Sequence, residues 1–410
     1  MVLGTSRHRA CTSMDDRSRM RYAAYLCYTS EAMKILMTGG GSGGHFYPLI
    51  AVAEALRDIV TEKKILSPDL YYMAVKPYNP GLLFDNEITF IPVSTGKMRR
   101  YFSLLNFFDI FRTALGCLSG LLKVYSLFPD VIFSKGGYPA VPALFAARIL
   151  RIPVVIHDSD SHPGRASLWS GKFAAKIALS YPQAAPYFGP RAQAKIAYTG
   201  NPIRPEIARP LTNGAHEFLR LEQGTPTVVI LGGSLGAAAV NDVILQALPE
   251  LLNRYQVIHQ TGTANFAEAK STAAVVLKDH PYAYRYHPFD YLNALAMRMA
   301  AGVADIVVSR AGSTIFEIAA WGVPSIIIPL PPAISHDQTT NALAYASTGA
   351  ATVIEEANLH SHILVEEIDR ICVTPSVRDT MKARARAFAK LDSARTIAQA
   401  ILDIALAHEK

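Results

Sequence analysis

A glycine-rich loop that ends in a histidine is the first stretch of the chain that could do chemistry. Residues 39–45 read GGGSGGH and come directly after a short apolar run. Bare backbone of this kind lets N–H groups approach an anion such as a phosphate, because side chains do not stand in the way. His45 stands at the edge of the loop, where a neutral imidazole could accept a proton near neutral pH. A tight turn without a ligand would give the same residues, so the loop alone does not name a function.

A second glycine loop lies in the other half of the chain. The stretch TVVILGGSLGAAAVNDVILQAL predicts a strand over 227–231, a glycine turn and then a helix. The first half has the same order, with a strand predicted over 34–38 and a helix that carries Pro48 in its first turn. Each strand–glycine loop–helix unit opens a doubly wound α/β domain, so we predict two Rossmann-like domains.

Further polar clusters come just after apolar, strand-like runs, at the edge where open parallel sheets bind ligands. They are DVIFSKGGYPAVP, IPVVIHDSDSHPG, YQVIHQTG, ADIVVSRAGSTIFEIAAWG and PSIIIPLPPAISHDQTTNA. We predict an N-terminal domain over 33–205, a linker near 204–218, a C-terminal domain over 218–390 and a final helical segment over 391–410. That segment could pack back on the N-terminal domain, and residues 1–32 are predicted to be a disordered extension or a mis-assigned start.

The composition is that of a well-packed globular protein, since half of the 410 residues are apolar and 18% are charged. The formal net charge of +7 favours an anionic partner, which could be nucleic acid, phosphate or an acidic membrane surface. The four cysteines lack metal-ligand spacing and are typical of the reduced thiols of a cytosolic protein. Uncharged apolar runs stay below the roughly 18 residues of a membrane span, so the sequence predicts neither a transmembrane helix nor a signal peptide.

Other chemistries have weaker support in the sequence. Neither glycine loop is followed by GK[ST], and the first half lacks the acidic residue about 20 positions on that a dinucleotide site would have. No Ser/His/Asp order and no helix-borne pair of carboxylates stands out, which makes a hydrolase a weak hypothesis. Residues 158–160 read DSD, and oxygen ligands at that spacing could hold Mg²⁺ or Mn²⁺.

Eight motifs, in order from Met33 to the C-terminus, together resemble the MurG family of peptidoglycan glycosyltransferases. They are GGSGGHFYP, SKGGYPAVP, VVIHDSDSHPG, TGNPIRP, LGGSLGA, HQTG, SRAGSTIFEIAAWGVP and HDQTTNA. Members of that family move N-acetylglucosamine (GlcNAc) from UDP-GlcNAc to lipid I, the undecaprenyl-diphosphate-linked muramyl pentapeptide, and so make lipid II. The resemblance implies an α/β protein of the GT-B fold, with two Rossmann-like domains whose parallel sheets face a central cleft.

For the acceptor side, the resemblance implies that His45 is either the general base or a ligand of the lipid-linked diphosphate. Asp160 stands where the family has an acceptor-contacting asparagine, and a carboxylate can only accept hydrogen bonds. Arg204 corresponds to an arginine placed near diphosphate. The acceptor-binding residues implied in this way are Gly41, Ser42, Gly43, Gly44, Gly137, Tyr138, Asp160 and Arg204.

For the donor side, the resemblance implies that Glu317 holds the two ribose hydroxyls and that Phe289 reads uracil through its backbone. Gln338 and Asn341 would contact the GlcNAc hydroxyls. The spacing from Arg310 to Glu317 is one residue shorter than the family pattern. The donor-binding residues implied in this way are Ser234, Phe289, Arg310, Ser313, Thr314, Glu317, Gln338 and Asn341.

The resemblance further implies an inverting, metal-independent reaction without a cofactor, so that the DSD triplet is a coincidence. The expected partners are UDP-GlcNAc, lipid I and an anionic membrane surface at the cytoplasmic face of the cell membrane, with no nucleic acid. The alternatives are another UDP-sugar enzyme of the same fold, acting on a different lipid or as a UDP-GlcNAc epimerase, and a catalytically silent sugar-nucleotide-binding membrane scaffold.

Helical periodicity divides the apolar residues between 102 and 122 into a predicted core stripe and a predicted membrane-facing set. We predict that the stripe packs in the core; its residues are Leu104, Phe108, Phe111, Leu115, Leu118 and Leu122. The predicted membrane-facing residues lie off that stripe, among cations; they are Phe102, Leu105 and Ile110, with Lys97, Arg99, Arg100 and Arg112 nearby.

Overall fold

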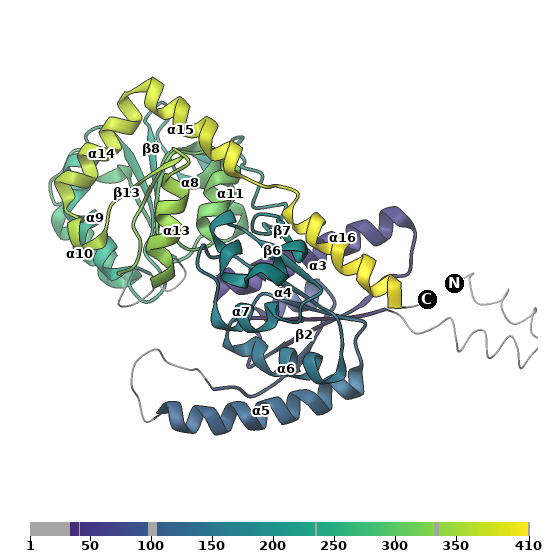
Figure 1. The fold of residues 1–410 in the computed structure, drawn as a ribbon. Helices are drawn as coiled ribbons and strands as arrows, with labels where there is room; N and C mark the ends of the chain where they lie inside the picture. The colour runs from purple at the N-terminus through teal and green to yellow at the C-terminus, as the bar shows by residue number, and fades with distance from the viewer. Residues whose placement is uncertain (1–32, 41, 97–104, 234–235, 332–335, 409–410) are drawn as a thin grey trace, which may run out of the picture.

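The computed structural model contains two parallel β-sheets, one in each half of the chain (Figure 1). The residues that it describes are 33–40, 42–96, 105–233, 236–331 and 336–408. The strands predicted over 34–38 and 227–231 are the central strands β1 and β8. The two predicted parallel-sheet domains are therefore present, and the parts of the predictions that fall on residues 1–32 and 97–104 lie outside the described residues.

The N-terminal sheet has seven parallel strands in the order β3-β2-β1-β4-β5-β6-β7. Their bounds are β1 (Lys34–Thr38), β2 (Asp69–Ala74), β3 (Ile88–Pro92), β4 (Val131–Ser134), β5 (Val154–Asp158), β6 (Lys176–Leu179) and β7 (Ile196–Tyr198). Successive residues of β1 enter different apolar clusters, Ile35 and Met37 on one face and Leu36 on the other. Because both faces are buried, the strands read as continuous apolar runs rather than as an alternation.

The C-terminal sheet has six parallel strands in the order β10-β9-β8-β11-β12-β13. Their bounds are β8 (Thr227–Leu231), β9 (Gln256–Gln260), β10 (Tyr286–Phe289), β11 (Ala304–Ser309), β12 (Ser325–Ile327) and β13 (Ala351–Val353). In both sheets the order reverses beside the first strand, between β1 and β4 and between β8 and β11. The loops that follow β1 and β8 therefore open into a crevice at the carboxyl edge of each sheet, where this topology binds ligands.

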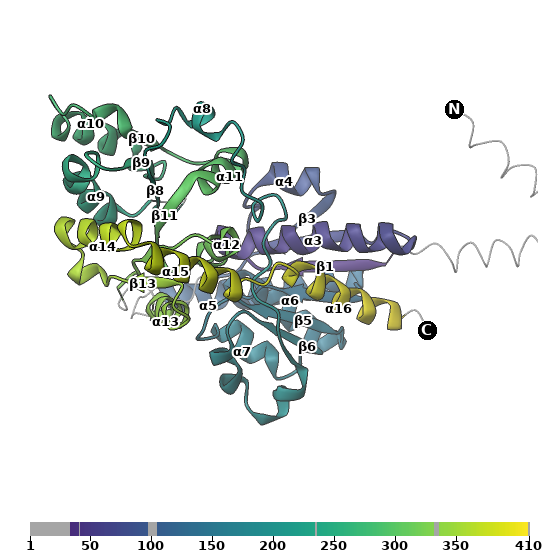
Figure 2. The same ribbon diagram turned by 90° about the horizontal axis from the view of Figure 1, so that it is seen from above.

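Helices cover both faces of each sheet (Figures 1 and 2). In the N-terminal half they are α3 (Gly43–Lys63), α4 (Pro80–Asp85), α5 (Leu105–Leu127), α6 (Val141–Leu150) and α7 (Arg165–Gly171). In the C-terminal half they are α8 (Ala215–Leu219), α9 (Ala238–Leu251), α10 (Phe266–Val276), α11 (Ala294–Val303), α12 (Thr314–Trp321), α13 (His336–Ala346), α14 (Ser361–Val373), α15 (Pro375–Phe388) and α16 (Ser393–His408). Short 3₁₀ helices lie at Tyr138–Ala140, Pro182–Phe188, Pro190–Lys195, Ala283–Arg285 and Glu356–Asn358.

The end of the chain crosses back to the N-terminal domain. Figure 2 shows α15 on the C-terminal domain and α16 running on from it alongside α3. Ser393 Oγ donates to the Gly200 carbonyl at 2.9 Å, and the stem of Lys390 lies so close that a Cβ on Gly200 would come within 2.5 Å of it. The apolar face of α16, with Ile401 and Leu402 fully buried, belongs to the same cluster as α3. The last helix therefore ties the two domains together.

The polar segment near 204–218 packs on the C-terminal domain. The indole N–H of Trp321 donates to the Ile207 carbonyl at 2.8 Å, and Leu211 N–H donates to the Arg298 carbonyl at 2.9 Å. The segment ends in the short helix α8, whose Leu219 joins the core of that domain.

Four of the six residues predicted to form a core stripe, Phe111, Leu115, Leu118 and Leu122 on α5, are exposed, so the prediction is wrong for them. The side chains of the other two, Leu104 and Phe108, lie outside those described. Two glycines set the buried face instead: a Cβ on Gly116 would lie 1.7 Å from the Ser94 carbonyl oxygen, and one on Gly120 would lie 2.9 Å from Pro142. Close approach at these small residues turns the large side chains outward. The exposed ones are Phe111, Leu115, Leu118, Leu122 and Tyr125, at 57%, 68%, 58%, 63% and 66%. The side chains of the predicted membrane-facing set other than Arg112 lie outside those described.

Truncation of the α16 core should destabilise the protein. Leu402→Ala removes a fully buried side chain and leaves a cavity between α16 and α3, with an expected loss of about 2–5 kcal/mol in the free energy of unfolding. Leu391→Ala is the matched control, since Leu391 is 66% exposed just before the same helix. Urea titration of both variants is the measurement, and equal losses would contradict the assigned packing of α16.

Candidate active site in the interdomain cleft

A cleft of about 610 Å³ separates the two domains and is lined by residues of both. Eleven of the residues predicted from the sequence line it: Ser42, Gly43, Gly44, His45, Asp160, Arg204, Arg310, Ser313, Thr314, Glu317 and Gln338. Gly137, Tyr138, Phe289 and Asn341 do not line it, and Gly41 and Ser234 lie outside the described residues. The structure thus brings most of the predicted residues of the two halves to one place.

The glycine loop after β1 brings bare backbone to the cleft at the start of α3. Ser42 is the N-cap in extended conformation, and its side chain makes no capping bond. A Cβ on Gly44 would lie 3.0 Å from Ser313 Oγ of the opposite domain, so a larger residue here would push the Ser313 side chain aside. The unpaired N–H groups of a first helical turn carry partial positive charge, which suits an anionic group.

His45 is fixed in one tautomer by the end of β4. Its Nδ1 lies 3.1 Å from the carbonyl oxygen of Lys135. A carbonyl oxygen can only accept, so Nδ1 carries the hydrogen and Nε2 keeps its lone pair. Burial lowers the pKa of His45, the charge of Lys135 lowers it further, and Asp160 opposes both. The imidazole is therefore neutral at neutral pH and able to take a proton on Nε2.

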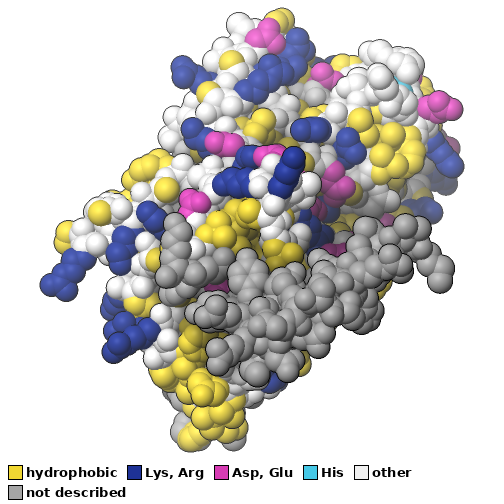
Figure 3. Space-filling model, turned by 90° about the vertical axis from the view of Figure 1, so that its right-hand side faces the viewer, with side chains coloured by type: hydrophobic (Ala, Val, Ile, Leu, Met, Phe, Trp, Pro, Cys, Tyr) yellow, Lys and Arg dark blue, Asp and Glu magenta, His cyan; other side chains and the backbone are white. Residues whose placement is uncertain are grey.

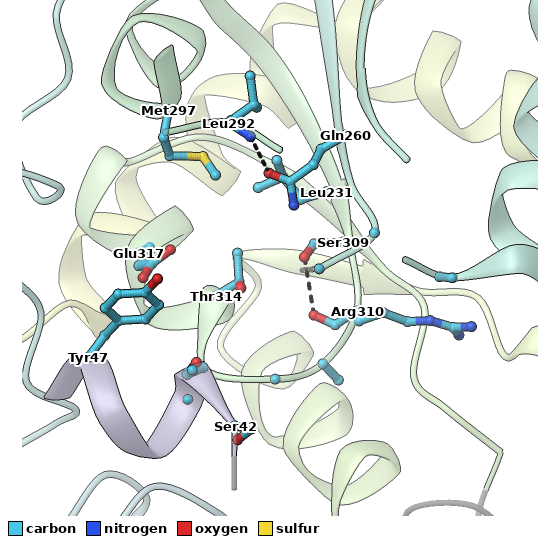
Figure 4. Close-up of a pocket in the computed structure, with 18 of the residues that line it drawn as sticks. Ser42, Tyr47, Leu231, Gln260, Leu292, Met297, Ser309, Arg310, Thr314 and Glu317 are labelled. Atoms are coloured by element: carbon cyan, nitrogen blue, oxygen red, sulfur yellow. Dashed lines mark hydrogen bonds between the residues drawn. The ribbon is translucent and has the colours of Figure 1, made fainter. Parts of the chain in front are cut away.

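Glu317 lies across the cleft in the first turn of α12. Burial raises the pKa of this carboxyl to about 7, and Arg204 opposes the shift. The Arg204 guanidinium lies 4.8 Å from the ring centre of Tyr47 and pairs with Glu206 at 2.5 Å. Figure 4 shows Tyr47 and Glu317 on the same side of the cleft. Arg204 thus lies at the α3–α12 side, near both domains.

The side chain of Arg310 makes its polar contacts within the C-terminal domain. Figure 4 shows its side chain extending away from the cleft. Its guanidinium pairs with Glu356 at 2.5 Å and donates to the carbonyls of Ile328 and Pro329 at 3.3 and 3.2 Å. The side chain therefore holds the segment after β12, while its backbone lines the cleft.

Two further predicted contacts are engaged within the protein. The Phe289 carbonyl accepts from Thr261 N–H at 2.9 Å and from Thr261 Oγ1 at 3.2 Å. Asn341 is 3% exposed and bonds across the cleft to the loop after β5: its amide donates to Asp160 Oδ1 at 2.8 Å. Asn341 Oδ1 accepts from Ser161 N–H at 2.8 Å and from Ser161 Oγ at 2.9 Å.

The two carboxylates of the DSD triplet have different surroundings. Asp158 is buried, and its carboxylate accepts backbone N–H groups of Asp160 and Gly164 at 3.0 and 3.1 Å. Asp160 lines the cleft. Within the described part of the chain, no three His, Cys, Asp or Glu side chains form a group suited to a metal ion.

Sequence reasoning missed several aromatic and amide groups of the cleft. Tyr47 Oη lies 3.2 Å from Tyr291 Oη, which joins the two domains at the cleft. Gln260 is the last residue of β9, and its side-chain oxygen accepts Leu292 N–H at 3.0 Å, as drawn in Figure 4. Tyr47 and Gln260 fall within the motifs GGSGGHFYP and HQTG, so those motifs could have pointed to them. Tyr291 carries no comparable signal.

Two parallel α/β domains that turn glycine loops and a neutral histidine toward a shared cleft define a protein of the GT-B fold. Family models agree: the glycosyltransferase family 28 N-terminal domain matches residues 35–179, and the family 28 C-terminal domain matches residues 227–400. The chain belongs to this family. The predicted fold class and the resemblance to MurG are both confirmed.

The curated relatives agree over most of their length. A protein of Treponema denticola is 34% identical over 346 residues, which is 81% of this chain and 86% of the relative. One of Bacillus thuringiensis is 33% identical over 341 residues, 82% of this chain and 91% of the relative. Both are named UDP-N-acetylglucosamine–N-acetylmuramyl-(pentapeptide) pyrophosphoryl-undecaprenol N-acetylglucosamine transferase.

Solved structures share the fold. Acinetobacter baumannii MurG has a TM-score of 0.67 at 24% identity, covering 90% of this chain and 99% of that one. UDP-GlcNAc 2-epimerase from Neisseria meningitidis, bound to UDP-GlcNAc, has a TM-score of 0.62 at 13% identity, covering 90% and 100%. At these identities the likeness concerns the fold alone.

The buried carboxyl of Glu317 should make stability depend on pH. Its folded pKa of about 7 lies above the unfolded value near 4.5, so the folded state binds the proton more tightly. Stability is then lost as pH rises through this window. Glu317→Gln should raise the free energy of unfolding by roughly 1–2 kcal/mol over the native protein at pH 8 and by almost nothing at pH 4.5. The gain at pH 8 is no larger because Glu317 remains partly open to the cleft.

Urea midpoints at the two pH values measure this gain. Glu250→Gln is the control, since Glu250 is exposed on α9 of the same domain and should give no pH-dependent gain. A Glu317→Gln protein that is less stable than the native one at pH 8 would contradict the assigned burial cost.

Proposed function

We propose that this chain moves N-acetylglucosamine from UDP-GlcNAc to the muramyl sugar of an undecaprenyl-diphosphate-linked acceptor, with inversion at the anomeric carbon. The names of relatives at 33–34% identity over four-fifths of the chain support this activity. The observation that carries it is the hydrogen bond from His45 Nδ1 to the Lys135 carbonyl. It leaves an unprotonated Nε2 on a residue that lines the cleft between the two glycine loops.

The two halves of the cleft would divide the work. The N-terminus of α3 would hold the diphosphate of the acceptor, while Glu317 and the loops after β8 and β11 would hold the nucleotide. The acceptor hydroxyl attacks the anomeric carbon and gives its proton to His45 Nε2. The bond from the anomeric carbon to the diphosphate oxygen breaks, and its electron pair leaves with UDP. Helix N-termini facing that diphosphate stabilise the developing charge.

Replacement of His45 tests this assignment. If His45 is the base, His45→Ala should lower turnover at saturating acceptor by about 10²–10⁴, with little change in acceptor affinity. The assay follows label from UDP-GlcNAc into a lipid-linked disaccharide, using a lipid I analogue. A loss confined to acceptor affinity, with saturated turnover kept, would instead make His45 a ligand of the diphosphate.

The same assay separates the alternatives. Release of an epimerised sugar without transfer to lipid would favour the epimerase, whose solved examples share the fold. Binding of UDP-GlcNAc with no product would favour a silent scaffold.

We infer that the exposed face of α5 docks on an anionic membrane, where the lipid-linked acceptor resides. Five large apolar side chains stand on this face, and Arg112 is also exposed beside them. Figure 3 shows hydrophobic side chains gathered at the lower end of the molecule, where Figure 1 places α5. Among the described residues, the helices are too short or too polar to cross a bilayer. An apolar helix face with cations is the pattern of a helix that lies in the membrane surface.

Charges on this face should weaken membrane binding. The double variant Leu118→Asp, Leu122→Asp should reduce affinity for anionic phospholipid vesicles by about tenfold or more, since it removes two apolar side chains from the docking face and adds repulsion. Val275→Asp is the control, because Val275 is 75% exposed on α10 of the other domain. Vesicle co-sedimentation provides the measurement, with a short-chain soluble acceptor to show that turnover persists. Unchanged sedimentation of the double variant would rule out α5 as the docking face.

A further inference from the structure

Lys135 is a buried lysine whose ammonium group has no hydrogen-bond partner among the described residues. It follows β4 directly, in the sequence SKGGYP, and its side chain is 2% exposed. An unpaired charge in such a place destabilises the fold, because water is lost and no partner replaces it. An apolar side chain of similar length could fill the same space without this cost, so the lysine points to a use for the charge.

The charge stands within a cluster of titratable groups around His45. Lys135 lies at the end of β4, His157 and Asp158 lie at the end of β5, and Asp160 lies in the loop that follows. Burial lowers the pKa of Lys135 to about 8, with Asp158 and Asp160 opposing the shift. Burial also lowers the pKa of His157, whose Nε2 lies 2.9 Å from the Gly200 carbonyl oxygen. His157 therefore stays neutral, and the charges that act on His45 come from Lys135 and Asp160.

Of the two carboxylates, that of Asp160 faces the cleft. Asp158 is already committed to two backbone N–H groups. Asp160 lines the cleft, and Asn341 holds its Oδ1 from the opposite domain at 2.8 Å. Because Asn341 also bonds Ser161 twice, the position of the Asp160 carboxylate depends on the two domains being together.

We propose that Lys135 and Asp160 are positioning residues for His45, with opposite charges that balance the neutral and the protonated imidazole, and that Asn341 couples this balance to domain closure. The proposal rests on the function proposed above, in which His45 takes the proton. The Lys135 carbonyl fixes the tautomer. The Lys135 ammonium lowers the affinity of Nε2 for a proton and the Asp160 carboxylate raises it, so the two charges together set how readily His45 takes the proton and gives it up again.

The two charges should move the titration of His45 in opposite directions. Lys135→Met keeps the carbonyl and the apolar stem but removes the positive charge, so the midpoint should rise by about one pH unit. Asp160→Asn keeps an oxygen for Asn341 and removes the negative charge, so the midpoint should fall by about one pH unit. Asn341→Ala should also lower the titration midpoint of His45, as Asp160→Asn does. NMR of histidine ring protons in the full chain measures this, with His45→Gln to identify the signal among the 12 histidines.

A matched control separates charge from general effects of losing a lysine. Lys195→Met removes an ammonium that donates to the Ala174 carbonyl at 2.9 Å, and it should leave the His45 midpoint in place. Lys135→Met should also fold at least as stably as the native chain, because it removes an unpaired buried charge. A His45 midpoint that stays unchanged in both Lys135→Met and Asp160→Asn overturns the proposal.

The pH profile of kcat/KM then distinguishes this proposal from the proposed function. If both hold, the acid limb moves up in Lys135→Met and down in Asp160→Asn, in step with the NMR midpoints. If the midpoints move and the acid limb does not, the charge balance around His45 stands, and the assignment of His45 as the base is the part that fails.

Discussion

The close approach of the loop after β1 to the end of β4 is the constraint on which the candidate site depends. A Cβ on Gly39 would lie 2.9 Å from the Cβ of Lys135, and one on Gly40 would lie 2.8 Å from the Tyr72 hydroxyl. Both glycines also have positive φ, at 148° and 141°, so two independent reasons require glycine there. This contact brings His45 within hydrogen-bond distance of the Lys135 carbonyl. The first two glycines thus serve packing within the fold, whereas Gly43 and Gly44 serve the open approach to the cleft.

Burial on both sides of the cleft favours neutral forms of groups that would be charged in water. It lowers the pKa of His45 and raises that of Glu317 to about 7. Neutral imidazole is the form that can accept a proton, so burial prepares His45 for its proposed use. For Glu317 the same burial disfavours the charged carboxylate, which is the form that would accept hydrogen bonds from two hydroxyl groups. The charge of Arg204 partly offsets this effect of burial. One physical effect therefore favours the proposed role of His45 and opposes the proposed role of Glu317.

Local patterns in the sequence were sufficient to predict the sheets and the glycine loops, because a strand, a glycine turn and the start of a helix together span only about twenty residues. They were insufficient where a contact joins distant segments. Helical periodicity identifies the stripe on α5 but cannot tell which face of the helix meets α6, because close contacts at Gly116 and Gly120 decide this. Arg310 and Asn341 likewise carry polar groups typical of ligand binding, yet their partners, Glu356 and Ser161, come from elements that no local pattern places nearby.

Two kinds of contact hold the two domains together, one along α16 and one at the cleft. The crossing into α16 is apolar and extensive, with Phe316 and Phe388 stacked at 5.7 Å where the chain leaves the C-terminal domain. Among the described residues, hydrogen bonds at the cleft join Asn341 with Asp160 and Ser161, and Tyr47 with Tyr291, while Tyr181 of the N-terminal domain adds ring contacts with Phe316 and Phe388. Each such hydrogen bond contributes only about 0.5–1.5 kcal/mol net, so these polar contacts hold the two domains together less strongly than the extensive apolar burial along α16 does.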